Sequence, residues 1–341
     1  MTNRFVRRAV DRLRAPSSDI LIEIAAAPPT MAEHDRLASA AGIFDALEAG
    51  GTGVGSPLGG SIRVAAWNGE RVKYAEGSAD LVRRSGADVL FLTETDVGMA
   101  RSGNRHTAAE LAGALGMTYA FGVEFLELGL GDEREQAELA GARNELGFHG
   151  NALLAKAPIL DPFVLRLDEG GVWWREVSKG QKRLGWRMAV GGWIALGGTR
   201  VLVASVHLES KTDPADRARQ TERLVGCLME AAGSAPILIG GDFNTNTLSM
   251  ETAGDWFERP EAHEPMFEVL GAAGFEWRDA NLAATTQRPS RTSTPRTPHR
   301  RLDWLFHRGL VASAPADLPA LDTDGEALSD HDLVAASFEL R

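Results

Sequence analysis

The stretch Pro236-Ile237-Leu238-Ile239-Gly240-Gly241-Asp242-Phe243-Asn244 joins an apolar run directly to a small polar cluster. The apolar residues 236–239 predict a short buried strand, and Asp242 and Asn244 follow where that strand ends. A buried carboxylate is costly unless it is paired or bound to a cation. For one strand taken alone, a salt-bridged core aspartate is the simpler interpretation, so Asp242 by itself does not identify a functional site.

Five further apolar runs carry polar side chains at an end or inside the run. These clusters are Trp67-Asn68-Gly69-Glu70 after 62–67, Leu92-Thr93-Glu94-Thr95-Asp96 after 88–92, Ser205-Val206-His207-Leu208-Glu209 at the end of 200–207, Asp303 inside 301–305, and Ser329-Asp330-His331-Asp332 before 333–338. Because strand ends of one sheet converge in space, we expect the polar side chains to form one oxygen-rich pocket. Its predicted members are Asn68, Glu94, Asp242, Asn244, Asp303 and Asp330.

Carboxylates packed together repel one another, and a divalent cation relieves that repulsion. Oxygen ligands favour Mg²⁺, Mn²⁺ or Ca²⁺ over Zn²⁺, and His207 and His331 lack the short spacing of a paired zinc motif. We interpret the two histidines as acid–base or phosphate-binding groups. Such a site suits hydrolysis of a phosphate ester, in which a cation screens the phosphoryl oxygens, a carboxylate activates water and a histidine protonates the leaving oxygen.

The composition of the chain is that of a folded globular protein. It has 341 residues, of which 44% are hydrophobic and 24% charged, and this length fits one large domain or two smaller ones. The single cysteine, Cys227, excludes an intramolecular disulfide framework and an all-cysteine zinc site, and we interpret it as a packing residue of a helix. Its isolation fits a cytoplasmic location. The net charge of −11 argues mildly against binding nucleic acid by bulk charge, although it does not exclude a local basic groove.

The N-terminal region differs from the rest of the chain. No apolar run reaches the ~18 residues that a transmembrane segment needs, and Glu23 interrupts the stretch 20–28, so we expect neither a membrane span nor a signal peptide. We predict an amphipathic helix over 5–14, further short helices and a Gly-rich linker over 50–60, which together make residues 1–60 an N-terminal extension.

Residues 61–341 are predicted to form one α/β catalytic domain. Short strands alternate with helices there, and the clearest helix begins at Thr212-Asp213-Pro214, where a capping side chain precedes a proline in the first turn. Two segments of this part are biased in charge. Residues 122–149 hold seven acidic and two basic side chains, and the Pro-rich loop 286–301 holds five arginines and no acid. Each is either ordinary solvated surface or part of the functional site.

Taken in order, these motifs, together with Gly150-Asn151-Ala152-Leu153-Leu154, resemble those of the endonuclease/exonuclease/phosphatase superfamily. The similarity runs from about residue 61 to residue 341. The resemblance implies an α/β fold, a four-layer α/β sandwich in which two mixed β-sheets lie face to face with helices outside. It also implies a metal-dependent hydrolase of phosphoric ester bonds that uses Mg²⁺, Mn²⁺ or Ca²⁺.

The resemblance implies a set of metal ligands at matching positions of this chain. Glu94 resembles the main metal carboxylate, and Asn68 lies beside it in the motif pattern. Asp330 resembles a further ligand that binds directly or through water. Some members of the family carry an aspartate two residues after the asparagine, and this chain has Glu70 there, so its role as a second ligand is open.

The resemblance also implies which residues carry the chemistry. Asp242 resembles the residue that orients or deprotonates the attacking water, and Asn244 the side chain that holds this water or a phosphoryl oxygen. His331 resembles a phosphate-contacting histidine that Asp303 orients. His207 lies where deoxyribonuclease I, sphingomyelinases and inositol-polyphosphate phosphatases carry histidine, which differs from the pattern of the exonuclease III-like abasic-site endonucleases.

Several nearby residues admit two interpretations. Asn151 is expected to shape the floor of the site, and nothing in the sequence gives His149 a role. Arg183 and Arg187 either contact substrate or are ordinary ion-paired arginines. The three clustered tryptophans form either an aromatic wall for a substrate or membrane interface, or part of the core; they are Trp173, Trp174 and Trp186.

Three classes of function are compatible with these motifs. The first is a metal-dependent phosphoesterase acting on a phosphorylated small molecule or a lipid head group, favoured by His207, the net acidity and the acidic segment 122–149. The second is a nuclease resembling deoxyribonuclease I, for which the loop 286–301 could hold a phosphate backbone. The third, a non-catalytic binding module, is disfavoured because no catalytic position is missing.

We predict in-line attack of water on phosphorus without a covalent intermediate, since the site offers no activated serine or cysteine. The oligomeric state is not readable from the sequence.

Overall fold

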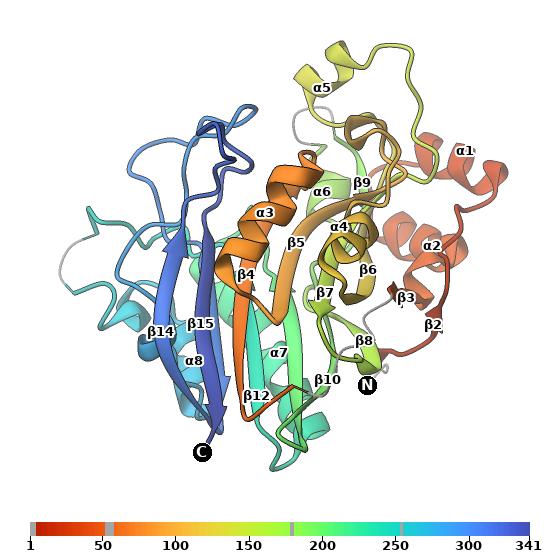
Figure 1. The fold of residues 1–341 in the computed structure, drawn as a ribbon. Helices are drawn as coiled ribbons and strands as arrows, with labels where there is room; N and C mark the ends of the chain where they lie inside the picture. Colours follow the sequence, from red (N-terminus) through yellow and green to blue (C-terminus); the bar gives the residue numbers. More distant parts are fainter. Residues whose placement is uncertain (1–4, 52–57, 178–180, 253–254) are drawn as a thin grey trace.

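Two mixed β-sheets packed face to face form the centre of the computed structural model, which describes residues 5–51, 58–177, 181–252 and 255–341 (Figure 1). In the described part of the chain the larger sheet has nine strands, in the order β14 (Leu310–Leu318), β15 (Leu333–Leu340), β4 (Ser61–Arg71), β5 (Val89–Val97), β7 (Phe148–Ala155), β6 (Thr118–Glu127), β3 (Leu47–Gly51) and β2 (Ala9–Val10), with β9 (Arg183–Gly185) beside β6. The smaller has six, in the order β1 (Phe5–Val6), β8 (Leu160–Arg166), β10 (Met188–Leu196), β11 (Thr199–His207), β12 (Ile237–Asp242) and β13 (Asp303–Arg308).

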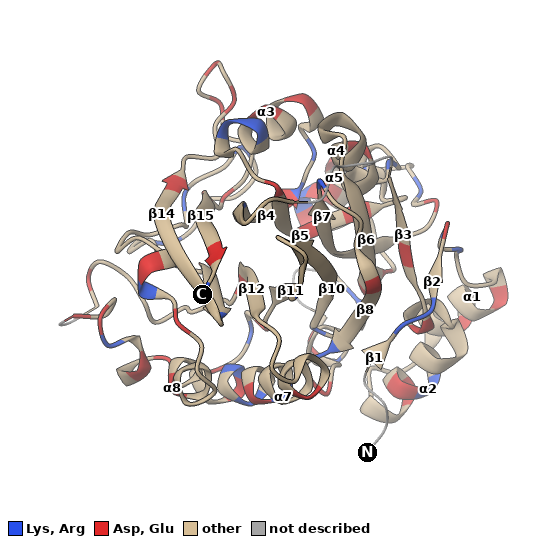
Figure 2. Ribbon diagram, turned by 60° about the horizontal axis from the view of Figure 1, so that its bottom comes forward, with Lys and Arg blue, Asp and Glu red and all other residues tan. Residues whose placement is uncertain are grey.

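Helices cover the outer faces of both sheets, so the molecule has four layers. Figure 2 shows α3 and α4 on one side of the sheets and α7 and α8 on the opposite side. The helices are α1 (Ser18–Ala26), α2 (Met31–Ala41), α3 (Ala75–Ser85), α4 (Thr107–Leu115), α5 (Glu133–Glu138), α6 (Val172–Arg175), α7 (Pro214–Ala232) and α8 (Met266–Ala272). Short 3₁₀ turns are η1 (Ile43–Asp45), η2 (Ala100–Ser102), η3 (Pro260–Ala262) and η4 (Arg278–Ala280). The sandwich that the sequence motifs implied is therefore confirmed.

The alternation of side chains along each strand builds these layers. On β5, Phe91 packs between the two sheets with residues such as Val203 and Leu238, whereas Leu90 and Leu92 face the helices on the other side. Successive side chains of a strand point to opposite faces, and strands covered on both faces read as continuous apolar runs. This is why all four residues between Asp88 and Thr93 are apolar.

The predicted strands and the main helix are present close to their expected limits. The helix predicted from Thr212 onward is α7, in which the side chain of Asp213 accepts a hydrogen bond from the backbone N–H of Asp216 and Pro214 occupies the first turn. Leu224 and Leu228 pack in the core beneath it, and Cys227 is a half-buried residue of the same helix.

The N-terminal prediction is partly wrong. Residues 5–14 do not form a helix; they contain strands β1 and β2, which pair with β8 and β3. The short helices expected after them are α1 and α2, and Ile24 and Leu37 from these helices are fully buried in the core. Of the expected Gly-rich linker, residues 52–57 lie outside the described residues. The division of the chain at residue 60 stays a prediction.

No described helix combines the length and the apolar character that crossing a membrane would require.

Candidate active site

The ends of β4 and β5 place two polar side chains at one edge of the larger sheet. The parallel pairing of these strands is interrupted by a bulge between Asn68 and Arg71, and the pairing of β5 with β7 by another between Leu92 and Thr95. Glu94 lies in the second bulge with a positive φ of 55°, which is uncommon for a residue with a side chain. Its backbone N–H donates to Oδ1 of Asn151 at 3.2 Å. A bulge re-aims a side chain, and here it presents the Glu94 carboxylate to the site.

Asp242 lies at the end of β12, where the two sheets meet. Asn68 from the other sheet donates from Nδ2 to Oδ2 of Asp242 at 3.0 Å, and the backbone N–H of Asn244 donates to Oδ1 at 2.8 Å. The Asn244 amide donates in turn to the carbonyl of Leu208 at 2.9 Å. Both oxygens of the buried Asp242 carboxylate are thus held at fixed positions.

Two histidines lie on either side of Asp242. Nδ1 of His331 lies 2.8 Å from Oδ2 of Asp303, which leaves Nε2 of the ring 3.9 Å from Oδ2 of Asp242. Nε2 of His207 lies 3.6 Å from the same oxygen, and its Nδ1 lies 3.2 Å from Oε2 of Glu124. Each ring is therefore oriented by a buried carboxylate behind it, while its other nitrogen lies near Asp242.

The segment that carries His331 is attached to β4 by backbone contacts. Trp67 donates from its indole N–H to the carbonyl of His331 at 3.0 Å, and the Ser329 hydroxyl donates to the carbonyl of Asn68 at 2.6 Å. The backbone N–H of His331 donates to that same hydroxyl at 3.0 Å. The motifs 67–68 and 329–331, far apart in sequence, thus form one rigid unit.

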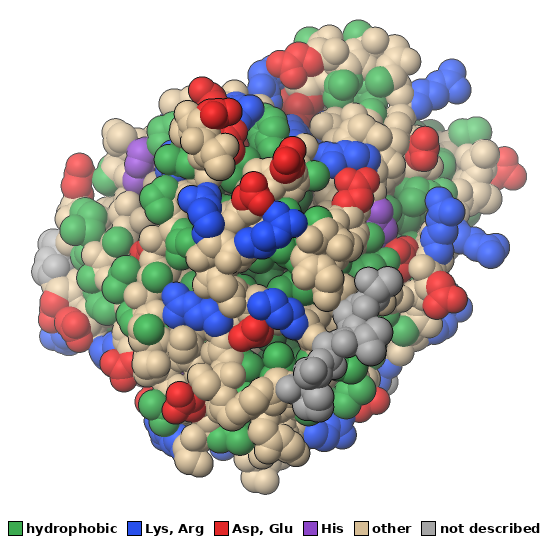
Figure 3. All heavy atoms as spheres, in the orientation of Figure 1, with side chains coloured by type: hydrophobic (Ala, Val, Ile, Leu, Met, Phe, Trp, Pro, Cys, Tyr) green, Lys and Arg blue, Asp and Glu red, His purple; other side chains and the backbone are tan. Residues whose placement is uncertain are grey.

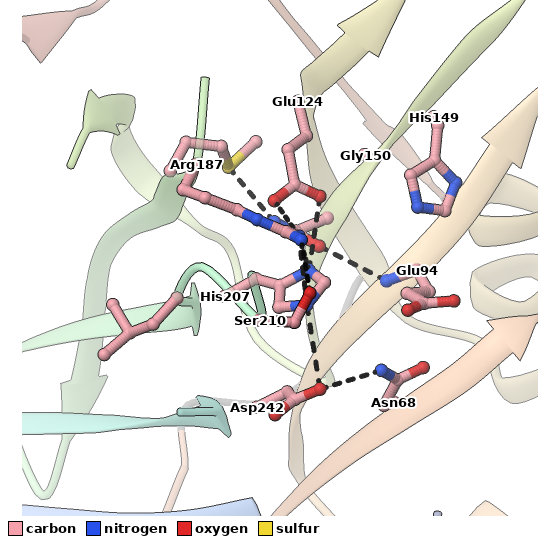
Figure 4. Close-up of polar contacts among 12 residues, drawn as sticks. Asn68, Glu94, Glu124, His149, Gly150, Arg187, His207, Ser210 and Asp242 are labelled. Atoms are coloured by element: carbon pink, nitrogen blue, oxygen red, sulfur yellow. Dashed lines mark hydrogen bonds and ion pairs between the residues drawn. The ribbon is translucent and has the colours of Figure 1, made fainter. Parts of the chain in front are cut away.

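A cavity of about 390 Å³ opens over these residues. Figure 4 shows Asn68 and Glu94 on one side of the site and His207, Asp242 and Arg187 on the other. The walls of the cavity are Arg71, Glu94, Asp132, His149, Trp173, Gln181, Arg183, Arg187, His207, Ser210, Lys211, Asp242, Asn244, Asn246, Gln287, Leu302 and His331. The lining is strongly polar, and it places carboxylate, imidazole, amide and guanidinium groups around one enclosed space.

Burial and charge shift the pKa values of the central groups in a direction that suits acid–base chemistry. Burial raises the pKa of Asp242 above its ordinary value, and the negative charge of Asp303 adds to this effect. Burial alone would lower the pKa of His331, but the carboxylates of Asp303 and Asp242 raise it well above its ordinary value. The pKa of His207 is raised in the same way, against burial, by Glu124 and Asp242. A buried carboxylate of raised pKa between two imidazoles of raised pKa places a base beside groups that can carry a proton.

The donor set at Glu94 fits a hard divalent cation. In the described part of the chain no hydrogen-bond donor reaches the Glu94 carboxylate, and the nearest cation, Nη1 of Arg71, lies 3.9 Å away. The amide oxygen of Asn68 accepts one bond, from the backbone N–H of Glu70 at 3.1 Å. Oxygen donors of this kind suit Mg²⁺ or Mn²⁺. A second group, Asp242, Asp303 and His331, offers ligand atoms within 4.8 Å of one another, but Nδ1 of His331 is already bonded to Asp303.

The structure brings most of the predicted site residues together at the cavity, and Asp330 lies outside this group. Glu94, Asp242, Asn244, His207 and His331 line the cavity, and Asn68 and Asp303 contact the lining residues from behind. Asp330 does not line the cavity; it lies near Glu70, whose pKa is raised by burial and by the charge of Asp330. The carboxylate of Glu70 accepts a hydrogen bond from the Thr292 hydroxyl.

The tryptophans and arginines left open by the sequence have separate roles in the structure. Trp174 is fully buried in the core and Trp186 packs against His34, whereas Trp173 lines the cavity. Arg183 and Arg187 also line it, and both are buried and ion-paired. The ion-paired interpretation of the arginines is therefore confirmed, whereas their contact with substrate stays a prediction, and of the three tryptophans Trp173 alone lies in the described lining of the cavity.

The sequence did not reveal the buried ion-pair network behind His207. Arg187 donates from Nη1 to Oε1 of Glu124 at 2.8 Å and from Nε to Oε2 of Glu209 at 3.0 Å, and Nη1 lies 3.1 Å from the ring of His207. The indole N–H of Trp173 donates to Glu209 as well. The signal available in the sequence was Glu209 directly after the predicted strand 200–207; Glu124 gave none beyond its place in the acidic segment 122–149.

Arg187→Met is expected to destabilise the fold by about 3–5 kcal/mol, because it leaves the buried carboxylates of Glu124 and Glu209 without their cation. Urea unfolding measures this. Arg200→Met is the matched control, since Arg200 forms an exposed pair with Asp161 and its loss costs about 1 kcal/mol or less. Equal destabilisation of the two variants would contradict the assigned network.

Asp168 gives the protein a pH-dependent stability. Burial, together with the charge of Glu209, raises the pKa of this carboxyl to about 8, whereas in the unfolded chain it is about 3.9. Between these values the folded state holds a proton that the unfolded chain has released, so the contribution of Asp168 to stability falls as pH rises from about 4 to 8. Asp168→Asn should therefore gain stability relative to the parent protein between pH 5 and pH 8 in urea unfolding. A difference between the two proteins that is independent of pH would contradict this.

The two charge-biased segments both reach the cavity, through Asp132 and Gln287. In the acidic segment 122–149, however, Glu124, Glu127 and Glu135 are buried and paired with arginine or lysine. Its repulsion of a polyanion is therefore weaker than the sequence alone suggests. In the loop 286–301, three arginines are paired with aspartates. These pairs are Arg288 with Asp332, Arg291 with Asp322, and Arg301 with Asp317.

Fold and site together are those of a phosphoester hydrolase built on an α/β sandwich. The sequence profile of the Endonuclease/Exonuclease/phosphatase family matches residues 67–331, and the chain belongs to this family. Its members hydrolyse phosphoester bonds, and so this protein is a hydrolase of that kind.

The similarity to known proteins covers most of the length of this chain. The uncharacterized protein YbhP of Escherichia coli K12 is 27% identical over 212 residues, which are 60% of this chain and 69% of YbhP. An endonuclease/exonuclease/phosphatase of Beutenbergia cavernae has a similar structure, with a TM-score of 0.53, 18% identity, and coverage of 82% of this chain and 72% of that one. A family protein from Leptotrichia buccalis gives a TM-score of 0.54 at 14% identity, with coverage of 82% and 100%. At such identities the structural likeness concerns the fold alone.

Proposed function

We propose that the protein is a divalent-metal-dependent phosphoesterase that hydrolyses a phosphate ester of a small molecule or a lipid head group. A water oriented by Asp242 attacks phosphorus in line, opposite the leaving oxygen. The observation that carries this proposal is the position of Asp242, held by Asn68 and Asn244 and approached by both histidines.

The described residues divide the reaction between them. Asp242, whose pKa is raised by burial, accepts the proton of the attacking water. His331, protonated and oriented by Asp303, donates hydrogen bonds to phosphoryl oxygens, and His207 lies where it can do the same or protonate the leaving oxygen. Asn244 holds the water or a phosphoryl oxygen at the mouth of the site.

We propose that Glu94 and Asn68 hold the cation, Mg²⁺ or Mn²⁺, and that Asp330, which lies near Glu70, is a further ligand that binds directly or through water. When bound there, the metal supplies positive charge that stabilises the phosphoryl oxygens as the bond to phosphorus breaks.

The dimensions of the site favour a small substrate. Its volume of about 390 Å³ is that of a small-molecule pocket. On the face drawn in Figure 3, basic and acidic side chains are interspersed, so that face carries no broad basic field of the kind that follows a nucleic-acid backbone.

The alternative is a nuclease like deoxyribonuclease I, and the loop 286–301 is the observation in its favour, since Gln287 reaches the cavity. The pairing of Arg288 and Arg291 with aspartates weakens it, because those guanidinium groups are already engaged. We also propose that the protein is cytoplasmic, and that residues 61–341 are the catalytic domain with residues 1–60 as an N-terminal extension.

A substrate screen in Mg²⁺ and Mn²⁺ tests the proposal. The panel is bis-p-nitrophenyl phosphate, sugar and inositol phosphates, sphingomyelin, plasmid DNA, single-stranded DNA and RNA. Hydrolysis of one of the small or lipid substrates supports the proposal, whereas cleavage of plasmid alone would favour the nuclease. The Asp242→Asn protein, purified in parallel, controls for contaminating hydrolases.

A further inference from the structure

Arg71 reaches the cavity through an unusual backbone conformation. Glu70, Arg71 and Val72 have positive φ angles of 41°, 73° and 52°, although none of them is glycine. The turn is closed by a hydrogen bond from the N–H of Val72 to the carbonyl of Gly69 at 2.7 Å. Strained residues of this kind persist only where the surrounding structure holds them, and they cluster at functional sites. The turn follows the metal-site residue Asn68 and places the Arg71 guanidinium 3.9 Å from the Glu94 carboxylate.

Two arginines of the cavity wall have hydrogen-bonding capacity that the protein does not use. In the described part of the chain, the Arg71 side chain makes no hydrogen bond; its carboxylate neighbours, Glu70, Glu94 and Glu135, lie 3.9–4.0 Å away, and its buried Nε has no partner. The buried Nε of Arg183 has no partner either, although Nη2 of that residue lies 2.9 Å from Glu127. Because both arginines line the cavity and the Arg71 guanidinium forms no hydrogen bond to a described residue, an acceptor from a ligand can bond to them.

The charges around these arginines also favour an anion. Burial lowers the pKa of Arg183, and the positive charges of Arg101 and Arg71 add to this against the opposing effect of Glu127. The Arg71 guanidinium is balanced by Glu94 and Glu135. A divalent cation bound to Glu94 would remove part of the negative charge that now faces Arg71. Lys211, which lies 3.8 Å from the centre of the Trp173 ring, lines the same wall.

We propose that Arg71 and Arg183 form a subsite that binds a second phosphate group of the substrate, beyond the one that is hydrolysed. This rests on the proposed function. The reacting phosphate has its own partners in Asn244, His207 and His331, whereas the two arginines add cationic donors that these residues do not need. The preferred substrate is therefore a small molecule with two phosphate groups.

Binding of non-hydrolysable probes tests this subsite without catalysis. Calorimetry in Mg²⁺ kept above the probe concentration compares methylenediphosphonate, which has two phosphonate groups, with methylphosphonate, which has one. The parent protein should bind the first at least about 10-fold more tightly. Arg71→Gln and Arg183→Gln should each weaken it by about 10- to 100-fold, the loss of a charge-assisted hydrogen bond, and change methylphosphonate binding little.

The fold should tolerate these variants, because Glu135 keeps Lys73 at 2.9 Å and Glu127 keeps Arg101 at 3.0 Å. Arg71→Lys keeps the charge but loses the bidentate guanidinium, so its loss of methylenediphosphonate affinity should be intermediate. This variant replaces Arg71→Gln if Arg71→Gln does not fold. Arg200→Gln, at an exposed site with a partner in Asp161, is the control and should bind like the parent.

Equal affinity of the parent for both probes, or equal weakening of both by Arg71→Gln, would overturn the subsite. Because no hydrolysis is measured, a failure of the proposed function leaves this result unaffected, and the substrate screen reports that failure separately.

Discussion

Asp242→Asn is expected to lower kcat for phosphoester hydrolysis by at least about 10³-fold, within the range that a positioned general base contributes. An asparagine side chain has nearly the same shape, and its one oxygen can accept the hydrogen bond from either Asn68 or the N–H of Asn244, but it cannot take a proton from water. Burial raises the pKa of Asp242, which means that the folded protein disfavours the charged form of this residue. Removal of this disfavoured buried charge offsets the loss of one of the two hydrogen bonds, so the variant should stay folded and lost activity is not lost folding. Initial rates at saturating substrate, with thermal melting of both proteins, measure the two effects.

The matched control is Asp216→Asn, on α7 near its N-terminus and outside the cavity. It should retain the parent kcat. Hydrolysis by Asp242→Asn within a few-fold of the parent would show that another group activates the water. His331→Ala gives an independent check, because it removes the imidazole that faces phosphate and leaves Asp242 intact.

The positions of the site residues were predictable because they follow from strand ends. Asn68, Glu94 and Asp242 each follow an apolar run, and the carboxyl ends of neighbouring parallel strands lie at the same edge of a sheet. Local sequence also predicted α7, since its cap and proline are contiguous in the chain. What could not be predicted is which sheet each strand joins, and therefore the contact between Asn68 and Asp242 across two sheets.

Buried ion pairs were the main feature that the sequence concealed. Glu124 belongs to a segment with seven acids, and its composition suggests exposed surface, yet the residue is fully buried on β6 beside Arg187. The partners are separated by more than sixty positions, and only the tertiary structure brings them together. Charge bias along a chain therefore says little about charge at a surface.

Backbone conformation was the second concealed feature. Residues 5–14 carry an amphipathic pattern, but their pairing with β8 and β3 decides that they are strands, because tertiary context overrides local helical preference. The left-handed turn at Glu70, Arg71 and Val72 lacks the glycines that usually announce one. Arg71 was for that reason absent from the residues that the sequence singled out.

Glu94→Gln is expected to reduce activity by at least about 100-fold at fixed Mg²⁺ and to raise the Mg²⁺ concentration needed for half-maximal activity by at least about 10-fold. Removing even the residues that orient metal ligands lowers metal affinity or activity about 10–100-fold. Glu94 is itself a proposed ligand, and no described residue donates a hydrogen bond to its carboxylate. The pKa of Glu94 is held below its ordinary value by Arg71, against the effect of burial, so its charged form is available to a cation at neutral pH. Activity titrated with Mg²⁺ measures both effects.

Chelation makes the same test on the parent protein. EDTA should abolish hydrolysis, and Mg²⁺ or Mn²⁺ added in excess should restore it, whereas full activity in chelator would remove the metal from the reaction.

The control for Glu94→Gln is Glu138→Gln, because Glu138 is an exposed residue of α5 that does not line the cavity. If Glu94→Gln and Glu138→Gln gave the same Mg²⁺ titration, the cation would have to bind elsewhere, and the group of described residues whose ligand atoms lie close enough together is that of Asp242, Asp303 and His331. In that case Asp242 would be a ligand instead of a base, because a carboxylate bound to a cation loses its proton affinity, and Asp242→Asn would then raise the Mg²⁺ requirement in place of Glu94→Gln.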